Sequence, residues 1–521
     1  MLKYISIGLL LIFTSTFCGC NLDTDDEDKM PGDKFWESAA NAEAFMLSVY
    51  QNLRKATTDN GFFLYAGDVR CAPITGQNTN NYLYLIQNDM KNYKAKKDSK
   101  EEGTSSDFGA IYNWQNMYKV VQSANIMIEE VANVKELSAV EVERYRAECK
   151  FLRNLAYFFM VRIFGDVPYY TEAYAAAPLP RMDKTVVLKT CLADLQTVLD
   201  NDPDKGILPW RNGSGSLRAN RGAVLTLMMH MNMWLAFFDE NNAVTYYNEV
   251  RRLAETDSWI DSSIYSLQSM SQMSEVFQGE SNEGLFEIAQ NVTMGEIFKT
   301  DHMWCTKVVY KIRNRTEPEF KYSEVFLKQL YPEETADMRK ESWFNYLYLD
   351  DDDYVGTARR LEIIKLLNAD TNGNSTIPNA GNYIVFRLAD AILLYAEALN
   401  NLGESNDALR EVNRIRQRAG APDFTDADNL DASIYWERVR ELMGEGQYFY
   451  DLVRTQKICD TDFAVFADES GHREKKADLK QGSWTWPIYK KALDNNPYMT
   501  KNLYWAVSYT HLRAHETSQD L

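Results

Sequence analysis

The sequence lacks any internal run of apolar residues long enough to cross a membrane. A spanning helix needs roughly 20 apolar residues, and the most apolar internal candidate, residues 151–170, contains Arg153, Arg162 and Asp166. We therefore expect that segment to be a buried helix of a globular domain. Residues 5–17, which follow Lys3, are apolar but shorter, and they predict a secretory signal peptide over residues 1–19.

Cysteine and histidine are scarce, with seven cysteines and five histidines among 521 residues. No two cysteines form a CxxC pair, so neither a zinc site nor a disulfide framework is expected. Cys149 lies in a helical pattern and predicts a small buried thiol. His230 is expected to pack on a helix face, while His302 and His472 stand alone in sequence. We predict no cofactor.

Catalytic motifs are also missing: the chain contains no GxSxG, no HExxH and no Walker A sequence. A glycosidase needs two carboxylates at a set separation, but with 75 acidic residues such pairs are unavoidable and decide nothing. The densest acidic run, residues 348–354, is typical of a solvated loop. We therefore predict that the protein is not an enzyme.

One segment resembles part of a calcium loop. Residues 368–379 place Asn368, Asp370 and Asn372 at the first, third and fifth positions of an EF-hand loop. The twelfth position holds Asn379 instead of the bidentate glutamate that such loops use. Calcium binding there and a simple Asn/Gly turn stay open as alternatives.

Basic clusters are few, and the formal net charge is −19. The densest basic run, residues 94–100, is followed directly by two glutamates. Because phosphate backbones repel so acidic a chain, nucleic acid is excluded as a partner.

The N-terminal apolar run ends in the sequence FCGC, residues 17–20. A small residue before Cys20 resembles a bacterial lipobox, so we predict lipidation of Cys20 and anchoring through acyl chains. Residues 20–35 are rich in acidic side chains, and this composition predicts a flexible tether. They also resemble the tag that sends some lipoproteins to the outer face of the outer membrane.

The last residues, 507–521, show no helical period and no cap. They resemble the translation of a transposon adapter used in sequencing libraries. We expect the natural chain to end near Trp505.

Helical periodicity dominates the rest of the chain. Apolar residues recur every three or four positions from Leu388 to Leu402, Gly403 ends this stripe, and a second stripe ends at Gly420. The two helices resemble a tetratricopeptide (TPR) pair. Similar pairs are predicted at residues 111–134 with 139–164, and at 219–238 with 243–256.

Two long inserts, residues 58–110 and about 258–382, interrupt the helices. Both are rich in aromatic residues and predict ordered, functional segments. Strand-like segments are few, such as residues 284–290 and 307–312. The expected domains are residues 36–257 and 258–506, with TPR-like helices at 383–455.

Several segments together resemble one known family. They are residues 32–54, 147–170, 386–403, 408–420, 437–454 and 486–505. In this order they resemble the SusD/RagB family of surface nutrient-binding lipoproteins. Cys149 and the TWPIY sequence near residue 486 depart from the family pattern, and both departures look structural.

The resemblance implies a mainly α fold, a TPR-like superhelix of about four degenerate helix pairs with long irregular inserts. It also implies a cell-surface lid over a TonB-dependent (SusC-like) outer-membrane barrel. Such a lid captures an oligosaccharide, or sometimes a peptide, and passes it to the barrel without cutting it.

A glycan site needs flat aromatic rings flanked by polar side chains, because sugars have apolar faces and hydroxyl rims. In the family, the two inserts commonly line this site. The first insert offers Asp68, Arg70, Asn78, Asn80, Asn81, Tyr82 and Tyr84. The second offers Trp304, Trp343, Phe344, Tyr346 and Tyr348. For each ring the alternative is a structural role, in which the ring packs against the helices and holds its loop in place.

Trp114, Trp234 and Trp436 lie in helical patterns and are expected in the core.

Two other functions compete with glycan capture. One is a TPR-type lipoprotein that scaffolds envelope assembly, and the other is a surface glycoside hydrolase. A neighbouring gene for a TonB-dependent barrel would favour capture over the scaffold, and glycan turnover would favour the hydrolase.

Overall fold

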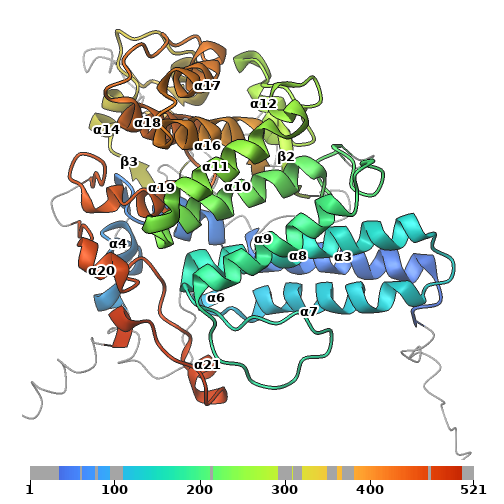
Figure 1. The fold of residues 1–521 in the computed structure, drawn as a ribbon. Coiled ribbons are helices and arrows are strands. Elements are labelled where there is room, and N and C mark those ends of the chain that lie inside the picture. The colour runs from blue at the N-terminus through green and yellow to red at the C-terminus, as the bar shows by residue number, and fades with distance from the viewer. Residues whose placement is uncertain are drawn as a thin grey trace, which may run out of the picture.

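The computed structural model describes residues 35–58, 61–76, 80–93, 109–211, 215–290, 308, 320–348, 361–366, 381–467 and 471–506. Within these ranges helices dominate and strands are short, as the sequence predicts (Figure 1). No helix there combines the length and the apolar character that crossing a membrane requires.

Four long helices form the N-terminal group: α3 (Ala39–Ala56), α7 (Gln115–Glu130), α8 (Ala139–Phe164) and α9 (Lys184–Asp200). Helices α3, α7 and α8 lie side by side (Figure 1), and α9 packs on α8. The helix pair predicted at residues 111–134 and 139–164 is confirmed as α7 and α8.

Helix α8 begins at a capping box that its sequence encodes. The Ser138 side chain accepts from the Glu141 backbone N–H, and the Glu141 carboxylate accepts from the Ser138 backbone N–H. Every residue from Phe151 to Phe164 is buried, so this segment is the buried helix predicted from its composition. Its charges have partners: Arg153 pairs with Asp194 at 2.6 Å, and the Arg162 guanidinium lies 4.1 Å from the Tyr450 ring centroid.

The second helical group contains α10 (Arg221–Phe238), α11 (Ala243–Glu255), α16 (Leu388–Asn401), α17 (Ser405–Arg418), α18 (Leu430–Leu442) and α19 (Tyr448–Arg454). Both predicted pairs here, α10 with α11 and α16 with α17, are confirmed. Helix α16 contacts α10, α11, α17 and α18, which places it at the centre of the group. Gly403 and Gly420 follow their helices with φ of 79° and 64°, a left-handed conformation that glycine adopts without strain.

Short helices lie in the inserts, in the C-terminal segment and between some of the long helices. The helices are η2 (Phe62–Val69), α4 (Asn80–Ile86), α6 (Gly109–Tyr112), η3 (Val131–Asn133), η4 (Glu240–Asn242), η5 (Thr256–Asp261), η6 (Met270–Gln272), α12 (Met273–Gln278), α14 (Glu324–Leu330), α15 (Arg339–Trp343), η10 (Lys457–Cys459), α20 (Lys476–Lys480) and α21 (Lys490–Asn495).

Six strands in the described residues form three antiparallel two-stranded ladders: β1 (Ile74–Gly76) with β3 (Phe320–Tyr322), β2 (Gly284–Ile288) with β6 (Tyr383–Arg387), and β4 (Phe344–Asn345) with β5 (Glu362–Ile363). Strand β2 confirms the strand predicted at 284–290. The one predicted at 307–312 lies outside the described residues except for Val308.

A cluster of buried charges ties the second insert to α18. Glu437 and Glu441 on α18 are fully buried and pair with Arg339 of α15 at 2.8 Å and 3.1 Å. Arg387, at the end of β6, pairs with Glu441 and Glu445 at 2.7 Å and 2.6 Å. Each of these charges has an opposite partner, which is the condition under which charges can be buried.

The cysteines follow the sequence expectation. Cys71, Cys149 and Cys191 are buried free thiols, Cys459 is half-buried, and none of these four forms a disulfide. The Cys149 sulfur lies 3.5 Å from the Met46 sulfur, between α8 and α3, so it packs as a small apolar side chain.

Candidate functional site

The β1–β3 ladder joins the two inserts, and its two strands lie more than 200 residues apart in the sequence. Thr75 pairs with Lys321 at the middle of this ladder, and both residues are exposed. Beneath them, the Tyr82 ring packs edge-on against Phe320, with centroids 5.1 Å apart, and it stacks on Tyr65 at 5.7 Å. We call this region, residues 74–76 and 80–84 with 320–322, the insert junction.

At the insert junction, the described rings lie mostly beneath the surface. Tyr82 is 7% exposed, and Tyr84 is half-buried. Asn80 and Asn81 lie in the first turn of α4, directly after β1. The junction therefore brings together four of the seven residues that the first insert offered.

Asp68 and Arg70 lie in the interior, where they hold the first insert to the C-terminal part of the chain. The Asp68 carboxylate accepts from the Gly446 N–H at 2.8 Å, and burial raises the pKa of that carboxyl well above its usual value. Arg70 donates to Asn88 Oδ1, the Trp484 carbonyl and the Ser483 carbonyl at 3.0, 2.6 and 3.1 Å. Their burial and these partners favour a structural role over direct contact with a ligand.

In the second insert, Trp343 is only 2% exposed, and its ring lies 4.3 Å from the Lys365 ammonium. Phe344 is buried in β4, and Tyr348 is half-buried. Tyr346 is 39% exposed and has a φ of 62°, so its ring is the one of these four that faces solvent. For Trp343 and Phe344, the loop-anchoring alternative fits their burial.

Trp114 and Trp234 are buried, as their helical patterns predict. Trp436 is half-buried and packs against the core, with its ring stacked on Phe463 at 5.7 Å. His230 is also buried: its Nε2 lies 2.6 Å from Asp390 Oδ2, and burial lowers the pKa of the imidazole. The packed helix face predicted for His230 is confirmed.

An open cleft of about 460 Å³ lies away from the insert junction. Its walls come from the start of α7, the loop at residues 168–179, and α21 with the segment that follows it. The rings of Trp114, Tyr118, Tyr170 and Tyr489 line it together with the amides Asn113, Gln115, Asn495 and Asn496. Sequence reasoning missed this cleft, because the three segments that form it lie more than 300 residues apart at their extremes.

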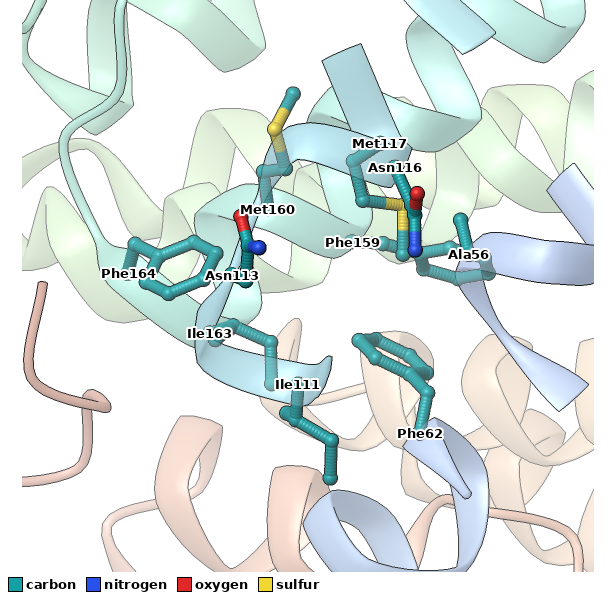
Figure 2. Close-up of a pocket in the computed structure, with 10 residues that line it drawn as sticks. All are labelled: Ala56, Phe62, Ile111, Asn113, Asn116, Met117, Phe159, Met160, Ile163 and Phe164. Carbon is teal, nitrogen blue, oxygen red and sulfur yellow. The ribbon is translucent and has the colours of Figure 1, made fainter. Parts of the chain in front are cut away.

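A second pocket, next to this cleft, holds only about 10 Å³ (Figure 2). Phe62, Phe159 and Phe164 surround it with aliphatic side chains, and Asn113 lines both it and the open cleft. That space suits about one water molecule. We therefore assign it to packing between the helices and not to ligand binding.

The amino-acid sequence matches the model of a known protein family. The SusD family model matches residues 210–505, more than half of the sequence. The chain belongs to the SusD family. A further family model, described as "Starch-binding associating with outer membrane", matches residues 27–204.

Individual SusD-family proteins resemble this chain over nearly its whole length. A crystal structure of a SusD homolog from Bacteroides thetaiotaomicron is 42% identical, with a TM-score of 0.80, over 89% of this chain and 98% of the other. SusD-like protein P38 of Formosa agariphila is 25% identical over 96% of this chain and 99% of its own. The surface glycan-binding protein A from Bacteroides uniformis shares the fold, with a TM-score of 0.66 at 19% identity, over 90% and 100%.

The SusD/RagB resemblance read from the sequence is thus confirmed, and so is the TPR-like helical fold class. Several other predictions lie outside the described residues: lipidation of Cys20, ligand contacts by the Trp304 ring and the Asn78 amide, and the calcium loop with Asn368, Asp370 and Asn372. Among the residues that are described, no group of three His, Cys, Asp or Glu side chains could hold a metal ion.

Proposed function

We propose that this SusD-family protein captures an oligosaccharide at the cell surface and passes it, uncut, to a TonB-dependent outer-membrane barrel. The β1–β3 ladder carries the proposal, because it draws both aromatic inserts to one place. A family model described as starch-binding and associated with the outer membrane supports it. So does the similarity in fold to a surface glycan-binding protein.

The proposed ligand site is the surface over the insert junction, extended by insert residues outside the described ranges. Tyr84, Asn80 and Asn81 at the junction are proposed contacts, and so is the exposed ring of Tyr346 elsewhere in the second insert. Trp304 and Asn78 are proposed outside the described ranges. An exposed ring such as Tyr346 can stack on a sugar face, and amides can bond to its hydroxyl rim.

Binding to immobilised polysaccharides tests this proposal. Purified protein should be retarded in native gels that contain a ligand polysaccharide, and a panel of plant, host and fungal glycans would identify that ligand. Tyr346→Ala and Trp304→Ala should each weaken binding by about fivefold, since a lost stack costs roughly 1 kcal/mol. Val325→Ala, a 68% exposed residue of the same insert, is the matched control.

The competing functions give different results in the same assays. Release of new reducing ends from a bound glycan would show a hydrolase and overturn the uncut transfer. Absence of binding across the whole panel, with no association with the barrel encoded beside the gene, would favour the envelope scaffold. Co-purification with that barrel would support delivery.

A further inference from the structure

We propose that the open cleft between α7, the 168–179 loop and α21 is a second carbohydrate site, which takes one or two pyranose rings. The proposal shares its ligand class with the proposed function and rests on it to that extent, but the site is separate. Among the described residues, none lines both this cleft and the insert junction.

The cleft presents rings that are held in place before any ligand arrives. Tyr118 and Tyr170 stack nearly parallel, with centroids 5.9 Å apart and planes 10° apart, and Trp114 meets Tyr118 edge-on at 5.7 Å. The Tyr118 hydroxyl donates to the Pro168 carbonyl at 2.6 Å. Rigid rings bind at low entropic cost, because little side-chain freedom remains to be lost.

The loop that forms one wall is fastened at both ends. The Tyr157 hydroxyl donates to the Tyr170 carbonyl at 2.8 Å and accepts from the Tyr170 N–H at 3.0 Å. Asn496 donates to the Leu179 carbonyl at 2.8 Å and so ties the far end of the loop to the segment after α21. These contacts keep about 460 Å³ open, within the range of about 300–1,000 Å³ that small-molecule sites occupy.

The polar side chains in the cleft are of two kinds. The first kind already makes hydrogen bonds within the protein: Asn496 donates to the Leu179 carbonyl, and Asn113 accepts from the Gln115 N–H at 3.1 Å. The side chains of Gln115, Lys491 and Asn495 are exposed, and they have no hydrogen-bond or ion-pair partner within the described part of the chain. Amides that can both donate and accept match the hydroxyl rim of a sugar, whose groups do the same.

Rings set beside unpaired amides favour a sugar over a helix or a lipid tail. An apolar helix face or an acyl chain would bury Gln115 and Asn495 without partners, which costs free energy. Lys491 is the one charged side chain among the described residues that line the cleft. Neutral sugars and uronic acids would both make the proposed ring contacts. Only a uronic acid has a carboxylate that could also pair with Lys491.

Hydrogen exchange of the full-length chain with maltohexaose, xylohexaose and a galacturonate hexamer tests the cleft. We expect slower exchange in residues 113–118, 168–179 and 489–499 with at least one of these probes. Tyr489→Ala with Gln115→Ala should abolish that protection and weaken binding at the cleft about tenfold, the equivalent of one lost ring contact. Tyr489→Phe keeps the ring and should retain binding.

The four outcomes separate this site from the proposed function. Protection of the cleft together with residues 61–93 and 320–348 supports both. Protection of the cleft alone supports the second site and overturns glycan capture at the insert junction. Protection of 61–93 and 320–348 alone overturns the second site and leaves capture standing. No protection with any of the three probes overturns the second site, and the wider polysaccharide panel then decides capture at the insert junction. Loss of galacturonate binding alone in Lys491→Gln identifies the acidic sugar.

Discussion

Glu437 is a fully buried carboxylate on α18 that faces three arginines. Arg339 and Arg416 each lie 2.8 Å from it, and Arg440 lies 2.9 Å away. Although burial by itself opposes ionisation, these cations lower the pKa of Glu437 to about 2. A carboxyl whose pKa is lowered on folding stabilises the fold above its unfolded pKa, and that stability is lost as the pH falls toward 2.

Glu437→Gln should therefore lower the free energy of unfolding at pH 7 by about 3–5 kcal/mol, because it leaves buried guanidinium groups short of a partner. The deficit should shrink between pH 4.5 and pH 3, where the wild-type carboxyl begins to lose its own contribution. Urea unfolding at several pH values measures both effects. Glu324→Gln on the exposed side of α14 is the control, with a change within about 0.5 kcal/mol. A deficit independent of pH would contradict this account.

Asp68 predicts the opposite pH dependence, because burial raises its pKa. A carboxyl with a raised pKa holds its proton more tightly when folded, so its contribution to stability is lost as the pH rises above the unfolded value. Relative to wild type, Asp68→Asn should gain stability from pH 4 to pH 7, by about 1 kcal/mol or more for each unit of the shift. Glycan affinity should not change. A growing deficit at pH 7, or lost binding, would show that Asp68 acts as a charged group.

At the scale of the elements, η2 depends on a close approach between two backbones. This π-helix has all eight residues buried, and Gly67 within it faces Gly446, in the turn between α18 and α19. A Cβ added at Gly67 would lie 2.3 Å from the Gly446 carbonyl oxygen, a distance that real Cβ atoms do not adopt. Glycine is required there for space, since the neighbour is backbone and cannot rotate away.

Gly67→Ala should cost about 2–3 kcal/mol of unfolding free energy through overpacking. Gly206→Ala is the matched control, since a Cβ there meets nothing within 4 Å, and its effect should stay within about 0.5 kcal/mol. Thermal and urea unfolding of both variants measure the difference. Equal stabilities would mean that η2 moves away from α19 without cost.

At the scale of the whole molecule, the helical groups act as a frame that carries two inserts and two separate surfaces. The insert junction uses the β1–β3 ladder, whereas the open cleft uses the start of α7, a long loop and α21. If both surfaces bind the same polysaccharide, one holds a distant part of that polymer while the other holds its end. Two linked weak sites raise the overall affinity without new contacts at either site.

The proposed lipid anchor also concerns the whole molecule, and the location of the protein in the cell tests it. Cys20→Ala should shift the protein from the membrane fraction to the soluble fraction, because acyl chains supply the proposed attachment. Cys18→Ala, two residues earlier, should leave it attached. Cell fractionation with immunodetection measures both. Retention of the Cys20 variant with release of the Cys18 variant would place the lipid on Cys18.

Local structure follows from residues that lie close together in the chain. The stripe from Leu388 to Leu402, the serine and glutamate that cap α8, and the glycines after α16 and α17 act within a few residues of chain, so their effect can be read without the fold. Several segments that occur in the same order along the chain as in the SusD family likewise revealed the relationship. The charged residues of the 151–170 segment were enough to assign it to a protein interior.

Which polar and aromatic side chains reach the surface depends on how distant segments pack together. Asp68, Arg70 and Trp343 are residue types expected at a glycan site, yet all three are buried. Asp68 and Arg70 bond to residues far along the chain, and the Trp343 ring lies beside Lys365. The open cleft arises where three distant segments meet, and no local pattern records such a meeting. Burial and pocket shape depend on which elements pack together, and that depends on the whole chain.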